Sequence, residues 1–414
     1  MPDAVIHWNN ILLDVIRDGG GSPCPIARGS AMMHGAIYDA VNSIIPTHAP
    51  YLVKVAAHPA ASIDAAIAYA AHDTLAAAFP STTVDLATKL SSAVQGLAPL
   101  ERAAGKGVGQ AAARAMITAR SGDGADDNTP YHANPNLKPG DWRPTGSGGA
   151  VSPNWPKVKP FCISSGSQLR PPRPGGFLSK TEMLRSEEYA AQVNDVQSLG
   201  RFDAEATGNR TPEQTKIAFF WANDVDGTYK PPGQLLDITR LVSEQRGLDV
   251  VENARLFALV SLSMGDAAIV AWDAKYSTDL DLWRPETAIQ MGDMDGNGAT
   301  KADPAWEPLS IDTAGNRFSP GFPAYISGHA TFGAAHAAIM RRYFGTDNVM
   351  FTATTEDPNA KGVERTFNSF TAAALENARS RIYLGVHFQW DGDHGFLSGT
   401  ALAEYVFANY LTPL

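Results

Sequence analysis

Apolar residues recur at intervals of three and four positions over much of this chain. The spacing is clearest in three alanine-rich stretches, at residues 61–78, 83–97 and 102–120. Positions three and four apart share one face of an α-helix, so each stretch is expected to form a helix with one buried side. The pattern therefore predicts a helical N-terminal half.

A different pattern begins at residue 121 and continues to residue 180. This stretch is rich in proline and glycine and contains isolated aromatic residues, among them Trp142, Trp155 and Phe161. Proline and glycine at this density do not sustain a helix or a central strand, so the stretch is expected to be a loop. Its aromatic residues favour a loop that wraps over the protein surface rather than a disordered one.

Helix signals resume at Thr211, Pro212 and Glu213, where a threonine cap precedes a proline at the first helical position. Further helices are expected at residues 236–245, 248–276, 327–344, 365–383 and 391–411. Alternating strand patterns are nearly absent, and no fixed-period repeat is present.

The predicted fold is thus all-α, with two halves that each resemble a four-helix bundle. The expected division is an N-terminal helical half at 1–120, a proline- and glycine-rich wrapping segment at 121–200 and a C-terminal helical half at 201–414. We expect these parts to form one compact domain.

The composition and net charge of the chain disfavour some classes of binding partner. The chain has 414 residues, is 44% hydrophobic and carries a formal charge of −10, with a pI near 5.5. This charge argues against nucleic acid or an anionic membrane as the main partner. The two cysteines, Cys24 and Cys162, are too few for a disulfide framework and are expected to be free thiols.

Two further features of the sequence bear on where in the cell the protein is located. Asp3 precedes any basic residue at the N-terminus, which is not a signal-peptide pattern. The most apolar stretch, at residues 256–272, contains Asp266 and is shorter than the roughly 20 residues of a membrane span. We expect a soluble, cytoplasmic protein, with secretion through a removed leader left open.

Candidate chemistry lies in three short strings of the C-terminal half: AWDAKYSTDLDLWRP (271–285), SPGFPAYISGHATF (319–332) and SRIYLGVHFQWD (380–391). Lys275, Arg284 and Arg381 together supply three positive charges, and an arginine fork suits an oxyanion because it donates two hydrogen bonds at once. Taken singly, each of these residues is better explained as an ordinary surface cation.

The middle string combines a helix cap with a histidine. Ser327 is expected to cap the helix that follows, whose first N–H groups could then face an anion, and Gly328 would let the anion approach the backbone. His329 would lie in the first turn, where it could exchange a proton. The alternative is an ordinary capped helix with a buried histidine.

The third string places His387 six residues after Arg381. An imidazole nitrogen can bind vanadium or attack phosphorus when the other ring nitrogen is fixed by a hydrogen bond. Asp391 could provide that bond, or it could cap the helix expected from 391 to 411, and both roles are compatible.

These three strings, in this order, resemble the anion site of vanadium-dependent haloperoxidases, which the type 2 phosphatidic acid phosphatases share. The resemblance implies that His387 binds vanadium and that His329 is the acid–base partner. The implied ligands of the vanadate oxygens are Lys275, Arg284, Arg381, Ser327 and Gly328. Trp272 and Phe322 match halide-pocket aromatics of the chloroperoxidases, and Asp224 resembles an acid that braces a site arginine.

Two departures from the family pattern stand out. The family has six residues between the lysine and the arginine, whereas here eight residues, YSTDLDLW, separate Lys275 from Arg284. This insertion could be absorbed as a bulge, or it could displace Lys275. The family also has proline before serine-glycine-histidine, and here that position is Ile326.

The resemblance implies a vanadate-dependent enzyme that uses hydrogen peroxide to oxidise a halide to a hypohalous species, which then halogenates a small organic acceptor. Bromide is the expected halide, with chloride and iodide as the others. One alternative is a soluble acid phosphatase that works through a phosphohistidine on the same residues, with phosphate in place of vanadate. Another is a non-catalytic, oxyanion-binding helical protein. A homodimer is a further expectation.

A few residues outside the three strings are also candidates for a role at a site. Asp293, Asp295 and Asn297 begin like a calcium loop, but Pro304 stands where an EF-hand needs glutamate. A turn is therefore favoured over calcium. His336 is expected to be a core histidine, and His394 could lie at a pocket entrance.

Overall fold

The computed structural model describes residues 3–132, 135–146 and 148–414. Its N-terminal part consists of α1 (Ala4–Gly19), α2 (Pro23–Ile44), α3 (Ile63–Ala78), α4 (Leu86–Ala93) and α5 (Pro99–Arg120). The three helices predicted from the alanine-rich stretches are present, although α4 is shorter than its apolar pattern. The sequence pattern did not single out α2, because Pro25, Gly29 and Gly35 interrupt it.

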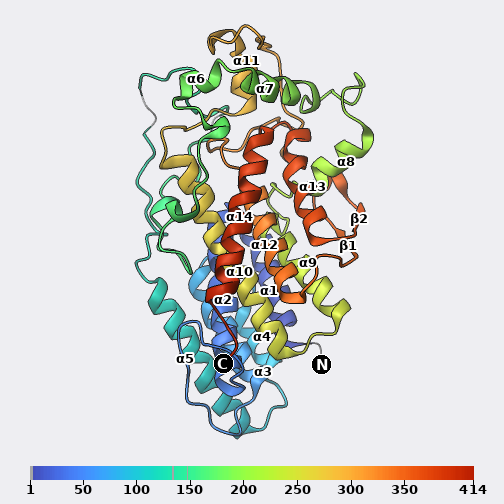
Figure 1. Cartoon of the computed structure of the whole chain (residues 1–414). Coiled ribbons are helices and arrows are strands. Elements are labelled where there is room, and N and C mark those ends of the chain that lie inside the picture. The colour runs from blue at the N-terminus through green and yellow to red at the C-terminus, as the bar shows by residue number, and fades with distance from the viewer. Residues whose placement is uncertain (1–2, 133–134, 147) are drawn as a thin grey trace.

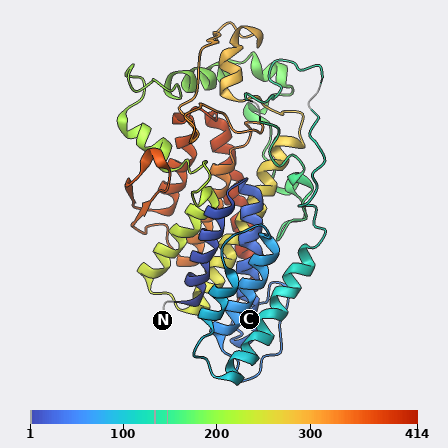
Figure 2. The same ribbon diagram turned by 180° about the vertical axis from the view of Figure 1, so that it is seen from behind.

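The loop predicted at residues 121–180 follows α5, whereas residues 180–184 and 187–199 of the predicted wrapping segment form helices. This loop runs along the outside of the elongated molecule from α5 to α6 (Lys180–Leu184; Figures 1 and 2). Its described residues contain only short 3₁₀ turns, at Trp155–Lys157, Gly166–Leu169 and Pro174–Gly176. Asp266, a buried residue of the helical core, accepts hydrogen bonds of 2.6–3.0 Å from three consecutive backbone N–H groups of the wrap, at residues 161–163. A carboxylate with three such donors holds this loop against the core.

The C-terminal part contains α6 (Lys180–Leu184), α7 (Glu187–Leu199), α8 (Pro212–Phe220), α9 (Lys230–Arg246), α10 (Val250–Tyr276), α11 (Pro285–Gln290), α12 (Gly328–Phe344), α13 (Phe370–Tyr383) and α14 (Gln389–Asn409). Single 3₁₀ turns lie at Gly292–Met294 and Pro358–Ala360. Strands β1 (Phe351–Thr354) and β2 (Glu364–Phe367) form a small antiparallel hairpin. The Thr211 capping box that begins α8 is present.

Helix α10 connects the two helical bundles, because it contacts helices of both. It packs against α2 of the N-terminal bundle and against α12 of the C-terminal bundle, so the two bundles share one hydrophobic core (Figure 1). Within the described residues, α10 has the length and mean hydropathy (1.6) of a membrane span, so the expectation that this stretch falls short was wrong. However, 94% of its most apolar window is buried inside the protein, which is the environment of a core helix.

The all-α prediction is confirmed, with two local corrections. Residues 365–367 were expected to begin a helix but lie in β2, and α13 begins only at Phe370, after the Ser369 cap. Thr366 and Phe367 favour a strand when a partner strand is available, and β1 supplies it. The last helix begins at Gln389, so Asp391 lies in its first turn and is not its N-cap. The division at residues 120 and 200 stays a prediction.

Candidate functional site

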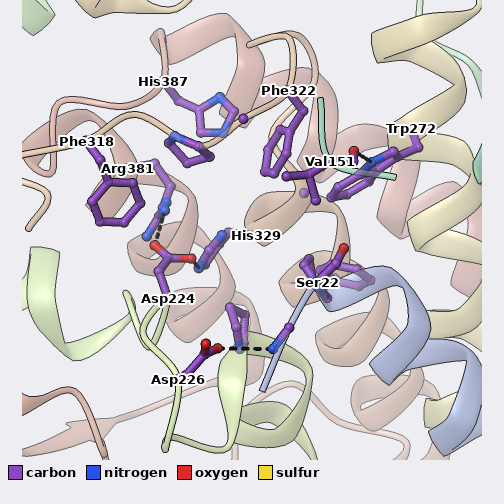
Figure 3. A pocket seen from close by; sticks show the side chains of 17 residues that line it. Ser22, Val151, Asp224, Asp226, Trp272, Phe318, Phe322, His329, Arg381 and His387 are labelled. Atoms are coloured by element: carbon purple, nitrogen blue, oxygen red, sulfur yellow. Dashed lines mark hydrogen bonds and ion pairs between the residues drawn. The ribbon is translucent and has the colours of Figure 1, made fainter. Parts of the chain in front are cut away.

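A cavity of about 350 Å³ lies where segments from both bundles and the wrap meet. Its walls come from the α1–α2 linker, Val151 of the wrap, the loop before α9, and the segments that carry the three chemical strings. Figure 3 shows the side chains that face it, with His387, Arg381 and His329 grouped on one side. Segments separated by more than 350 residues in the sequence thus share one site.

His387 lies between α13 and α14 and is buried. The turn before it requires glycine at residue 385: its φ is +83°, and a Cβ there would lie 2.5 Å from the Gly200 carbonyl oxygen. His387 Nδ1 is 3.0 Å from Asp391 Oδ2, and Nε2 is 3.2 Å from Arg284 Nη1. Because arginine can only donate, Nε2 must carry the lone pair and Nδ1 the proton.

Asp391 fixes this tautomer from the first turn of α14. Its Oδ2 also accepts the backbone N–H of Phe388 at 3.0 Å. Burial raises the pKa of Asp391, and burial followed by the nearby arginine and lysine charges lowers the pKa of His387 well below its usual value. The imidazole is therefore neutral at pH 7, as a metal ligand must be.

Arg381 and Arg284 approach His387 from two directions, and both are buried. Arg381 Nη2 donates to Asp224 Oδ2 at 2.7 Å, while Arg284 donates to the carbonyl oxygens of Phe322 and Val386, each at 2.7 Å. Among the described residues, Nε and Nη1 of Arg381 and Nη2 of Arg284 find no hydrogen-bond partner. Burial, followed by the charge of Arg381, lowers the pKa of Arg284 to about 9.

Lys275 lies in the last turn of α10 and is fully buried beside this cluster. Its Nζ donates to the carbonyl oxygens of Pro323 (2.7 Å) and Ala324 (3.1 Å) and lies 4.8 Å from the centre of the Phe322 ring. The Arg284 guanidinium lies 4.6 Å from the same ring. Lys275 therefore lies close to Arg284 and Phe322, although it is not part of the cavity lining.

Ser327 caps α12, with its Oγ accepting the Ala330 N–H at 3.3 Å, and its own N–H donates to the Asp391 carbonyl oxygen at 2.9 Å. This second bond joins the start of α12 to the start of α14. Gly328 lines the cavity, and a Cβ there would lie 3.2 Å from the Trp272 ring. The small residue keeps the helix N-terminus open to a bound group.

His329 faces the cavity from the first turn of α12. Its Nε2 is 3.2 Å from the Ala222 carbonyl oxygen and 3.9 Å from Asp224 Oδ1. The carbonyl can only accept, so Nε2 carries the proton and Nδ1 is the basic nitrogen. Burial and then the charge of Arg381 lower the His329 pKa to about 4.

Asp224 contacts both of these residues (Figure 3). Burial raises its pKa, but the charges of Arg381 and His329 outweigh that effect, and the net shift is downward. The carboxylate is therefore ionised and holds the Arg381 fork in place. The loop that carries it is itself anchored, because Lys230 Nζ donates to the Asp224 carbonyl oxygen at 2.8 Å.

The two aromatics matched to a halide pocket lie together. The rings of Trp272 and Phe322 are 4.8 Å apart, and Trp272 Nε1 donates to the Val151 carbonyl oxygen at 3.1 Å. Sequence reasoning missed several other cavity residues, including Ser22, Phe318 and Asp226. They carry no catalytic motif, and only the fold brings them to this site.

The remaining candidates lie elsewhere. His336 is a core residue, with Nε2 3.1 Å from Thr239 Oγ1, and His394 Nδ1 contacts the Tyr325 hydroxyl at 2.6 Å, outside the cavity lining. Asp295 accepts hydrogen bonds from Asn297 N and Thr300 Oγ1, as in a polar turn. In the described part of the chain, no group of three or more His, Cys, Asp or Glu side chains could hold a metal ion.

The chemistry of these donors fits an oxyanion. The buried side chains of Arg284, Arg381 and Lys275 lie around His387, and three guanidinium nitrogen atoms lack partners within the described residues. Burial, followed by the charge of Arg284, lowers the pKa of Lys275 well below its usual value. Unpaired buried donors are costly, and a phosphate-like anion would satisfy them while offsetting the repulsion between the cations. Vanadate and phosphate both meet this requirement, and the neutral Nε2 of His387 adds a ligand for vanadium.

Part of the chain is similar in sequence to known proteins. Residues 255–413 match the family model described as the VCPO second helical-bundle domain. A 267-residue region, 52% of this chain, is 31% identical to the vanadium chloroperoxidase of Curvularia inaequalis, and the match spans 43% of that protein.

Similar solved structures extend the match to the whole fold. A bacterial vanadium-dependent iodoperoxidase superposes with a TM-score of 0.83 at 22% identity, covering 100% of this chain and 97% of that one. A bacterial vanadium-dependent chloroperoxidase superposes with a TM-score of 0.71 at 18% identity, covering 94% and 93%.

The fold is mostly helical, and its cavity brings together buried donors of a kind that suits an oxyanion. The chain has the fold of these solved vanadium-dependent haloperoxidases.

Proposed function

We propose that this protein is a vanadate-dependent haloperoxidase, which uses hydrogen peroxide to oxidise a halide to a hypohalous species that halogenates a small organic acceptor. The observation that carries the proposal is the set of buried, unpartnered guanidinium donors around the neutral Nε2 of His387. A purely structural arginine would have those donors satisfied by protein groups.

Each residue has a defined role in this proposal. His387 Nε2 would bind vanadium, with Asp391 keeping the proton on Nδ1. Arg284, Arg381 and Lys275 would hold the oxygens, together with the Ser327 hydroxyl and the Gly328 N–H. When bound, vanadate would supply Lewis-acid activation of hydrogen peroxide without a change in its own oxidation state.

His329 would accept and return the proton that is transferred during the reaction. With its pKa near 4, the ring is neutral at pH 7, and Nδ1 can take a proton from a peroxide O–H group. A bound anion places negative charge beside the ring and thereby favours the protonated form. Asp224 would stabilise the resulting imidazolium, since its Oδ1 is 3.9 Å from Nε2.

Bromide is the halide we propose first. The Trp272–Phe322 pair lines the cavity, and the positive edges of these aromatic rings suit a weakly hydrated anion. The similar proteins are named for chloride and iodide, so both are included in the test. A cytoplasmic location and a homodimer remain part of the proposal.

The phosphatase alternative uses the same groups. An oriented, neutral His387 is also a competent nucleophile toward phosphorus, and His329 could protonate the leaving oxygen. A non-catalytic oxyanion-binding protein would bind vanadate without turnover.

One experiment separates these functions. Protein prepared without vanadate is given hydrogen peroxide, a chromogenic phenol and bromide, chloride or iodide, before and after addition of orthovanadate. Halogenation that appears only with vanadate and declines when phosphate competes supports the haloperoxidase. Hydrolysis of p-nitrophenyl phosphate that vanadate inhibits, without halogenation, would make the protein a phosphatase. Binding of vanadate with neither activity would leave the oxyanion-binding protein.

A further inference from the structure

Lys230, the first residue of α9, occupies a position that is unfavourable for a lysine in three respects. It is only 4% exposed, although lysine is almost never buried unless its charge is paired. Its φ is +57°, in the left-handed region that residues with a side chain rarely adopt. It also places a positive charge at a helix N-terminus, where the helix dipole favours negative groups. Unfavourable placements of this kind cluster at functional sites, so Lys230 is a candidate for a functional role.

The Lys230 ammonium joins two parts of the loop that precedes α9. Its Nζ donates to the Asp224 carbonyl oxygen at 2.8 Å and lies 2.7 Å from Asp226 Oδ1. Asp226 in turn accepts the Gly21 N–H of the α1–α2 linker at 3.1 Å. Lys230 itself is not among the described residues that line the cavity, so any effect on an anion bound there must act through its neighbours.

We infer that Lys230 is a positioning residue of the oxyanion site. Its ammonium fixes the backbone at Asp224, and the Asp224 carboxylate then holds Arg381 and His329 in the arrangement that binds the anion. The inference rests on the oxyanion site of the proposed function, and it adds to that site a residue that does not touch the anion.

The route from Lys230 to the anion is short. Asp224 Oδ2 accepts a hydrogen bond from Arg381 Nη2 at 2.7 Å, and Asp224 Oδ1 is 3.9 Å from His329 Nε2 (Figure 3). The same loop supplies the Ala222 carbonyl oxygen, which is 3.2 Å from His329 Nε2. A shift of the backbone at Asp224 would therefore displace the Arg381 guanidinium, whose Nε and Nη1 have no partner within the described residues.

Hydrogen bonds that do not involve the ammonium hold the rest of this loop. Thr228 Oγ1 donates to the Val225 carbonyl oxygen at 2.9 Å. Asn223 Oδ1 accepts the Glu356 N–H at 3.2 Å, and the Tyr229 N–H donates to Glu356 Oε2 at 2.8 Å. Variants without the ammonium are therefore expected to fold, and the geometry at the aspartate that it contacts is the property that should change.

The first test is a calorimetric titration of inorganic phosphate into protein prepared without phosphate or vanadate. Lys230→Met removes the ammonium and keeps the left-handed strain, whereas Lys230→Gly removes the ammonium and relieves the strain, because glycine adopts a positive φ freely. We expect both variants to raise the Kd for phosphate about fivefold, as for a coupling through packed neighbours. Lys230→Gly should nevertheless unfold at the higher temperature. The inference is overturned if either variant binds phosphate as tightly as the unmodified protein, or if affinity follows the unfolding temperature.

The matched control is Lys216→Met, because Lys216 is an exposed lysine of α8. This variant loses the same charge and should leave the Kd for phosphate unchanged. An equal effect of Lys216→Met and Lys230→Met would mean that only net charge matters, and the positioning role would be wrong.

A double-mutant cycle with Asp224→Asn separates positioning from a direct effect of charge. In the Asp224→Asn background, Lys230→Met should change the Kd for phosphate by less than about twofold, because the route to the anion is already broken. A full effect in that background would mean that Lys230 acts on the anion through its charge, which would also overturn the inference. Circular dichroism checks that each variant is folded.

Vanadate-dependent halogenation by the unmodified protein is measured in parallel and tests the proposed function. If halogenation is absent while the expected pattern of phosphate affinities is found, the proposed function fails and Lys230 remains a positioning residue of an oxyanion site. If halogenation depends on vanadate while the Lys230 variants bind phosphate normally, only this inference fails. Absence of phosphate binding by the unmodified protein would overturn the inference as well.

Discussion

Replacing Arg381 by lysine tests whether the unpartnered guanidinium donors are the anion site. The change keeps the positive charge but removes the planar fork. Arg381 uses Nη2 for Asp224 and leaves Nε and Nη1 without partners in the described structure. A lysine ammonium at this place could keep the Asp224 bond or turn toward the anion, but it could not supply two parallel donors.

The expected loss follows from the donor count. Two charge-assisted hydrogen bonds contribute roughly 1.5–3 kcal/mol each, and the ammonium can recover one of them. The net loss is then about 1.5–3 kcal/mol, which corresponds to a roughly 10- to 150-fold increase in the Kd for vanadate. Inorganic phosphate should lose affinity by a similar factor, because the missing bonds go to oxygen and not to the metal.

Isothermal titration of orthovanadate and of phosphate measures both constants. The matched control is Arg379→Lys on the same helix, since Arg379 forms a surface ion pair with Asp195 and does not line the cavity. A change in Kd below about threefold, or an equal change in the control, would refute the reasoning from donor count.

Three further predictions concern single side chains. His387→Ala should weaken vanadate binding at least roughly 100-fold, measured by titration, because the metal loses its protein ligand. His329→Ala should slow halogenation about 10²- to 10⁴-fold at pH 7 with a smaller change in vanadate Kd, measured by steady-state kinetics. Burial raises the Asp266 pKa to about 6, which means that the folded state binds this proton more tightly than the unfolded state. The free energy of unfolding should therefore fall as pH rises from about 4 through 6. Asp266→Asn loses hydrogen bonds and should be less stable than the unmodified protein, but its stability should not fall in this way. The difference between the two proteins in the free energy of unfolding, measured with urea, should therefore shrink by up to about 3 kcal/mol between pH 4 and 7.

Local sequence patterns were sufficient to predict most of the helices. The cap at Thr211 and the apolar spacing of α3, α5 and α10 all indicate helix without reference to the rest of the chain. The failures have physical reasons. Residues 365–367 pair with a strand that local spacing cannot reveal, and α2 is interrupted by residues that are tolerated only because the packing is close.

Packing decided the geometry of the site. The eight-residue interval after Lys275 left open where that lysine lies, and only its contacts with Phe322 and the carbonyls of Pro323 and Ala324 fix its position beside the cavity wall. Similarly, the proton on His387 Nδ1 follows from the positions of Asp391 and Arg284, which lie four and 103 residues away in sequence.

By itself, the sequence determined the helical class, the wrapping loop and the residue types of an oxyanion site, because helix periodicity, capping and proline content act over a few residues. Only the tertiary structure decided which donors remain unpaired and which apolar walls enclose the space beside them. Those properties depend on contacts between the α1–α2 linker, the wrap and the C-terminal bundle, whose distances no local pattern encodes.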